Sequence, residues 1–322
     1  MLRGRSALVT GGGTGLGKAT ALELARCGAV VTIAGRRADV LAAAAAEIGA
    51  VAGGEVHTVV GDVREADDAR RLIGETLERA VHLDLLVNNA GGQFFSPAEL
   101  IATKGWRAVW RLNVDGMLNM SEAAYELAFD GVGVAPGSGM EPGSGGETRP
   151  GGDAGLGGGT GPGPDAGAVE GVDSEQGPGA AEGVGAGASI VNVTLSPHHG
   201  MPGMAHSGAA RATVEALTRE LAQRWADAGV TATAIAVGTF DTEVMVKYPA
   251  AVRAGMSRSV PLQRTGTVAE HAWLVALLAS PLGRAFNGST ITLDGARDNW
   301  FGPWPPPGLT DDSGEVPVEE RR

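Results

Sequence analysis

The chain has 322 residues, and its hydrophobic fraction of 43% is enough for one α/β domain with a substantial core. Its formal net charge is −12, but regions 130–188 and 309–322 carry −8 and −3 of it, so the rest of the chain is nearly neutral. That balance excludes nucleic-acid binding through a basic face. The single cysteine, Cys27, cannot form an internal disulfide, and no uninterrupted apolar stretch approaches about 20 residues, so we expect a soluble cytoplasmic protein with no membrane contact.

The chain is organised around residues 5–17, RSALVTGGGTGLG. Apolar residues at 7–9 predict a short buried strand, and 18–26 carries a helical apolar pattern. Between them, Gly11 allows a tight turn, Gly15 lets the backbone approach a pyrophosphate, and Gly17 lets the helix pack near the strand. A flexible glycine turn is the alternative. The strand before and the helix after it favour a phosphate site at a helix N-terminus.

Further buried strands are predicted at 29–34, 55–60 and 83–88, separated by helical segments that end near 48 and 80. A long helix follows at 106–129. Strands that alternate with helices indicate a doubly wound parallel sheet, the Rossmann architecture.

The composition changes abruptly at 131–188, where 22 of 58 residues are glycine. Such a segment buries too little apolar surface to offset the entropy of ordering it, so we expect a disordered surface insertion. The alternative is a regulatory or partner-binding loop.

After the insertion, strands are predicted at 189–194, 231–237 and 289–293, and helices at 205–228 and 268–279. The expected sheet therefore has seven strands in a single domain. Region 1–130 forms its dinucleotide-binding half and 189–298 its catalytic half, followed by an aromatic-proline segment and acidic tail at 299–322.

Several motifs at proper spacing resemble the short-chain dehydrogenase/reductases: TGGGTGLG, Asp62-Val63, NNAGG, Asn113, SIVNVT and NGSTITLDGA. More narrowly, GGQFFSPAELIATKGWRAVWRLN and HSGAARATVEALTRELA resemble both peroxisomal trans-2-enoyl-CoA reductases and bacterial citronellol/citronellal dehydrogenases, without choosing between them. The resemblance implies an oxidoreductase that acts on a small-molecule substrate and assembles as a homo-oligomer.

The resemblance also implies a dinucleotide across the C-terminal ends of the strands. Arg36 and Arg37 stand where an NAD-specific member places an acid, and guanidinium groups favour a 2′-phosphate, so NADP(H) is the expected cofactor. The alternative is that both arginines are solvated loop charges. The other residues expected to bind the cofactor are Gly11, Thr14, Gly15, Leu16, Gly17, Asp62, Val63, Asn89, Ala90, Gly91, Arg211, Gly238 and Thr242.

The family's usual chemistry uses Asn, Ser, Tyr and Lys. In this chain Asn113 is unchanged, whereas Thr194 stands at the serine position, Ser207 at the tyrosine position and Arg211 at the lysine position. Neither of the two tyrosines in the sequence aligns with the missing acid. An aliphatic hydroxyl lacks the acidity of a phenol, so ordinary ketone reduction is disfavoured.

Reduction of a conjugated double bond does not require an acidic phenol, because hydrogen-bond donors to the thioester oxygen suffice. Thr194, Ser207 and Asn113 are the expected donors, Arg211 is expected to hold the ribose, and His206 is the candidate general acid. No cysteine or carboxylate cluster accompanies the nearby histidines, so we expect no metal.

The residues therefore favour an NADP-dependent reductase of a trans-2-enoyl thioester. One alternative is an alcohol/aldehyde dehydrogenase of the citronellol type. The other is a cofactor-binding protein that lacks the Tyr/Lys pair and has little turnover.

Overall fold

A computed structural model of the protein describes residues 1–129, 187–196, 198, 203–243, 245 and 256–299. Of the predicted insertion only residues 187 and 188 are described, and nearly all of the predicted tail segment also lies outside the described residues. Within the described part of the chain, no helix is both long and apolar enough to span a membrane.

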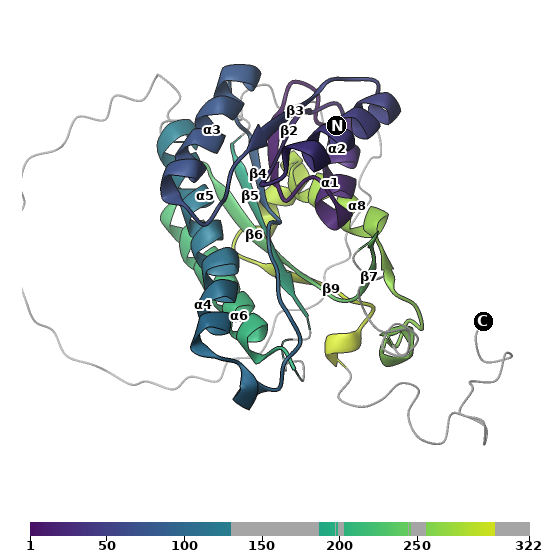
Figure 1. Ribbon diagram of the computed structural model, residues 1–322. Helices are drawn as coiled ribbons and strands as arrows, with labels where there is room; N and C mark the ends of the chain where they lie inside the picture. The colour runs from purple at the N-terminus through teal and green to yellow at the C-terminus, as the bar shows by residue number, and fades with distance from the viewer. Residues whose placement is uncertain (130–186, 197, 199–202, 244, 246–255, 300–322) are drawn as a thin grey trace, which may run out of the picture. The chain divides into compact units, whose positions relative to one another are not determined.

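The described residues form a parallel sheet of seven strands in the order β3-β2-β1-β4-β5-β6-β9 (Figure 1), which confirms the predicted doubly wound architecture. The strands are β1 (Ser6–Thr10), β2 (Val30–Gly35), β3 (Val56–Val60), β4 (Leu85–Asn88), β5 (Ser189–Leu195), β6 (Thr231–Val237) and β9 (Thr290–Leu293). A separate two-stranded pair joins β7 (Phe240–Asp241) to β8 (Gly266–Thr267).

Helices cover both faces of the sheet (Figure 1). One face carries α1 (Gly15–Arg26), α2 (Ala38–Ala52) and α8 (Val268–Leu278). The other carries α3 (Ala66–Ala80), α4 (Thr103–Trp110), α5 (Gly116–Ala124) and α6 (Ala205–Arg224). Short turns of helix at η1 (Ala98–Leu100), η5 (Ser257–Ser259), η6 (Pro281–Phe286) and η7 (Arg297–Asn299) connect these elements.

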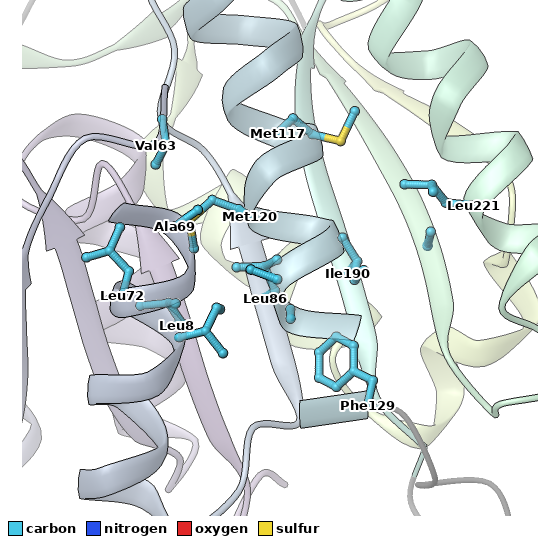
Figure 2. Packing of buried hydrophobic residues seen from close by; sticks show 14 of the residues in the cluster. Leu8, Val63, Ala69, Leu72, Leu86, Met117, Met120, Phe129, Ile190 and Leu221 are labelled. Atoms are coloured by element: carbon cyan, nitrogen blue, oxygen red, sulfur yellow. The ribbon is translucent and has the colours of Figure 1, made fainter. Parts of the chain in front are cut away.

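The sheet separates two hydrophobic clusters, because successive side chains of a strand point to opposite faces. In β1, Leu8 joins the cluster under α3, α5 and α6, whereas Ala7 and Val9 join the cluster under α1, α2 and α8. Figure 2 shows the first cluster, in which Leu86 and Phe129 are fully buried. Strands buried on both faces read as continuous apolar runs, which is why they are predictable from the sequence.

The long helix expected at 106–129 is instead interrupted by two wider turns, η2 (Arg111–Asp115) and η3 (Tyr125–Phe129). Asn113 lies in the first of them, and its side-chain Nδ2 donates to the Val109 carbonyl at 2.7 Å. An α-helix would direct the backbone N–H of residue 113 to that same carbonyl. The side chain thus competes with the helical ladder, and the turn widens at a position predicted to be functional.

Candidate active site

A cavity of about 610 Å³ opens at the C-terminal ends of the strands. Its walls come from the loops after β1, β2, β3 and β4, from the ends of β5 and β6, and from α6. In a sheet with this strand order, the helical connections change sides between β1 and β4, and ligands bind outside the strand ends at that point.

The glycine turn after β1 forms one wall. Gly11 and Gly15 adopt φ values of +65° and +54°, a left-handed conformation that only glycine adopts readily. Gly17 lies behind the turn, where an added Cβ would stand 2.3 Å from the Gly11 carbonyl oxygen. Thr14 and Leu16 also line the cavity, and the Thr14 side chain makes no capping hydrogen bond to α1. The first N–H groups of α1 are therefore available to an anion.

Two arginines follow β2. Both Arg36 and Arg37 line the cavity, and neither forms a salt bridge with another described residue. Asp62, after β3, also lines it; hydrogen bonds from the Arg64 side chain, with a smaller effect of the charge on Arg36, hold the pKa of this carboxyl below its ordinary value. The wall thus presents two guanidinium groups without a salt bridge to a described residue, close to an acid whose pKa is lowered.

The turn after β4 is held against β1 by Thr10, whose Oγ1 accepts from the backbone N–H groups of Asn89 and Ala90, each at 3.0 Å. The Asn89 side-chain amide donates back to the Thr10 carbonyl at 2.9 Å. Gly91 fits closely, because a Cβ there would stand 2.4 Å from Nη2 of Arg211. All residues predicted to bind the cofactor line the cavity except Gly17. Val63, Gly238 and Thr242 are among those that line it.

Arg211, on α6, is a partly buried cation at the cavity wall. Its Nη1 donates to the Val193 carbonyl at 2.6 Å, and its Nε has no hydrogen-bond partner among the described residues. Burial lowers the pKa of this guanidinium to about 10. A buried donor without a partner costs free energy.

Asn113 and Ser207 are buried behind the wall and are not among the described residues that line the cavity. Asn113 holds the loop after β4, since it donates to the Gly92 carbonyl at 2.9 Å and accepts from the Gly92 N–H at 3.2 Å. Ser207 donates to Oε1 of Gln93 at 3.4 Å, and Gln93 does line the cavity. Both residues are placed to act on a ligand through a neighbour.

Thr194, at the end of β5, lines the cavity, and its hydroxyl donates to Oε1 of Glu215 at 2.9 Å. The same carboxylate oxygen lies 3.1 Å from Nε2 of His198, whose Nδ1 faces Oδ2 of Asp298 at 2.5 Å. Burial lowers the pKa of His198, but the hydrogen bond to Asp298 and the charge of Glu215 outweigh it and raise the pKa above its ordinary value. Nothing in the sequence alone distinguishes Glu215 or Asp298 as a site residue.

His206 is not part of the hydrogen-bonded group formed by Thr194, Glu215 and His198. Its ring is buried against Phe94, with ring centroids 4.3 Å apart, and near Trp106 at 6.0 Å. Neither ring nitrogen has a hydrogen-bond partner among the described residues, and burial lowers the pKa of the imidazole below its ordinary value. His206 is not among the described residues that line the cavity, and its role as general acid stays a prediction.

Comparisons with known proteins agree with this geometry. Residues 5–133 match the short chain dehydrogenase family, and residues 178–296 match the family described as Enoyl-(Acyl carrier protein) reductase. A probable 2,4-dienoyl-CoA reductase, (2E)-enoyl-CoA-producing, of Bacillus subtilis is 30% identical over 306 residues, which cover 94% of this chain and 98% of that protein.

Two further relatives carry related names. A peroxisomal 2,4-dienoyl-CoA reductase, (3E)-enoyl-CoA-producing, of Arabidopsis thaliana is 29% identical over 92% of this chain and 85% of that protein. A solved structure of a citronellol catabolism dehydrogenase from Pseudomonas aeruginosa superposes with a TM-score of 0.67 at 31% identity, covering 92% of this chain and 96% of that one. With its sheet order, its glycine turn and these matches, the chain belongs to the short-chain dehydrogenase/reductase family and is an oxidoreductase.

Proposed function

We propose that this oxidoreductase uses NADP(H) to reduce a conjugated carbon–carbon double bond in an acyl thioester. The observation that carries the proposal is the composition of the cavity wall. Thr194, Gln93 and the buried cation Arg211 line it, and no tyrosine is among the described lining residues. Tyr125 stacks on Trp225 with ring centroids 4.6 Å apart, in the core under α3, α5 and α6.

The cavity fits a dinucleotide that carries a 2′-phosphate. The glycine turn leaves room for a pyrophosphate beside the N-terminus of α1, and the guanidinium of Arg211 in the cavity wall suits a ribose hydroxyl. Arg36 and Arg37 offer guanidinium groups that bind phosphate oxygens in pairs. When bound, such a reduced nicotinamide cofactor supplies a hydride.

The remaining wall suits a substrate whose negative charge develops on an oxygen. The Ser207 hydroxyl donates to the side-chain carbonyl oxygen of Gln93. The side-chain NH₂ of Gln93 is therefore left as a hydrogen-bond donor for the cavity. Addition of hydride to the β-carbon of a conjugated thioester moves charge to the thioester oxygen, where such a donor stabilises it. An unactivated ketone or alcohol needs an acid or base of moderate pKa at the carbonyl oxygen instead.

The alternative is an alcohol or aldehyde dehydrogenase of the citronellol type, which the 31% identity and 96% coverage of the Pseudomonas aeruginosa dehydrogenase support. The names of the relatives from Bacillus subtilis and Arabidopsis thaliana support an acyl thioester as the substrate.

One pair of assays separates the two. The purified protein is given NADPH with crotonyl-CoA or a 2,4-dienoyl-CoA, and separately NADP⁺ with citronellol, while absorbance of the reduced cofactor is followed. We expect NADPH oxidation with a thioester and no reduction of NADP⁺ by citronellol. Turnover of citronellol alone would establish the alternative, and binding of NADPH without turnover of either would indicate a cofactor-binding protein.

A further inference from the structure

Three side chains connect the cavity to the solvent. Thr194 lines the cavity, Glu215 lies behind it with 10% of its side chain exposed, and His198 reaches the surface with 31% of its side chain exposed. We propose that Thr194, Glu215 and His198 form a proton relay that delivers the proton for the reduction in place of the absent phenol. This inference rests on the proposed function, because a double-bond reduction takes up one proton for every hydride.

The hydroxyl of Thr194 cannot serve a substrate by itself. It carries a single proton, which it donates to Oε1 of Glu215 at 2.9 Å. While Glu215 is ionised, that proton points away from a ligand. Thr194 can donate its hydroxyl proton to a substrate only when Glu215 is protonated and can donate a proton to Thr194. The protonation state of Glu215 therefore controls whether Thr194 acts as a proton donor.

Glu215 is placed to pass a proton on. Its Oε1 lies 2.9 Å from Oγ1 of Thr194 and 3.1 Å from Nε2 of His198, so a single oxygen atom bridges both partners. A proton that arrives from the imidazole therefore needs only a reorientation of one O–H group to face the threonine. Both distances lie within the range over which protons are transferred.

His198 is held as the entry point. Its Nδ1 faces Asp298 at 2.5 Å, and its backbone N–H donates to the other oxygen of the same carboxylate at 2.5 Å. Asp294 in turn accepts from the backbone N–H of Asp298 at 2.7 Å and from the hydroxyl of Ser196 at 2.5 Å.

Among the described residues, the charged groups that face the His198 imidazole are Glu215 from α6 and Asp298 from η7, with Asp294 one step behind. Both ring nitrogens thus face carboxylate oxygens, and an imidazolium, which has two N–H donors, satisfies both hydrogen bonds. The raised pKa of His198 agrees with that geometry.

Hydride addition leaves an enolate on the substrate, which takes the hydroxyl proton of Thr194 as the proton of Glu215 moves to Thr194. Glu215 has received that proton from Nε2 of His198, whose N–H bond breaks. His198 is left neutral with its remaining proton on Nδ1 toward Asp298, and it regains a proton from water at the surface.

The test compares wild type with E215Q, which keeps the shape and hydrogen-bonding capacity of the side chain but not its ability to relay a proton. E220Q, an exposed position on the same helix, is the matched control. We expect E215Q to lower kcat by about 10²-fold, within the range of general acid catalysis, with NADPH affinity within about twofold of wild type. Wild-type kcat should fall as pH rises through the pKa of His198, and E215Q should lose this limb; E220Q should keep it.

A second readout needs no turnover. Histidine NMR titration, with the His198 signal assigned by its loss in H198Q, should show a pKa above the ordinary value in wild type and a lower one in E215Q. An unchanged pKa in E215Q, or an unchanged kcat and pH profile, would overturn the relay. If E215Q fails to fold, the kcat and pH profile of H198Q decide instead.

The two proposals fail differently. Absence of thioester reduction by wild type would refute the proposed function, whereas the NMR titration would still decide whether His198 and Glu215 are coupled.

Discussion

Replacing the buried cation Arg211 with methionine should stabilise the cofactor-free protein while weakening its affinity for the cofactor. Arg211 is partly buried in the wall; among the described residues its Nε has no partner, and its guanidinium donates to a neutral carbonyl, that of Val193. Buried charges of this kind are costly, and a methionine of similar length removes the charge while filling the space.

The magnitude follows from the pKa. Burial lowers the pKa of Arg211 from 12.5 to about 10, a shift that corresponds to about 3 kcal/mol against the charged form. Because the folded-state pKa is the lower one, this cost is fully present at neutral pH and would disappear only as pH rises above the folded pKa. Losing the hydrogen bond to the Val193 carbonyl lowers the free energy of unfolding by about 1 kcal/mol. The net gain is about 2 kcal/mol in the free energy of unfolding, or roughly 4–8 °C in Tm for a domain of this size.

Thermal and urea unfolding without cofactor measure this gain directly. R211K is the matched control, because it keeps a cation on the same helix and should show no comparable gain. NADPH titration of R211M should show weaker binding than wild type. A cofactor-free R211M that unfolds at or below the wild-type temperature would refute the argument that this cation is retained for a ligand at a cost in stability.

Other expectations concern the cofactor site and the insertion. Changing Arg36 and Arg37 together to aspartate should weaken NADPH binding about 100-fold and NADH binding far less in fluorescence titrations; equal losses would contradict the assignment of the 2′-phosphate to these residues. G17A should abolish dinucleotide binding and lower the free energy of unfolding by about 1–3 kcal/mol, because its Cβ would meet the Gly11 carbonyl oxygen at 2.3 Å. G74A is the control: no atom lies within 4 Å of the added Cβ, so cofactor binding and the free energy of unfolding should not fall. Equal unfolding curves for the two variants would count against the close packing at Gly17. Deleting residues 137–183 should leave Tm within about 2 °C of wild type, since the segment lacks core-forming residues; a large drop in calorimetry would show that it is packed.

The sequence predicts the sheet well because each parallel strand is an apolar run bounded by glycine or polar turns. The strand expected at 231–237 coincides with β6, and that at 55–60 is one residue longer than β3. The glycine turn and the residues after β2, β3 and β4 are likewise predictable, because short-range spacing alone places them at one end of the sheet.

The catalytic wall is less predictable, because it depends on contacts between distant segments. His198 lies 17 residues from Glu215 and 100 from Asp298, and nothing in the local pattern distinguishes these carboxylates from other acids. The burial of His206 depends on aromatic rings from two other segments. The wider turn at Asn113 arises from a competition between its side chain and the helical ladder that apolar periodicity does not reveal.

The most direct test of the account follows the atoms of the reaction. The protein is incubated with NADPH deuterated at C4, on the face that the enzyme uses, and with crotonyl-CoA in ordinary water, and the acyl product is examined by mass spectrometry and NMR. The account predicts a saturated thioester that carries deuterium on its β-carbon and a solvent proton on its α-carbon. A product without deuterium, or deuterium found only in an alcohol formed from an added aldehyde, would contradict it.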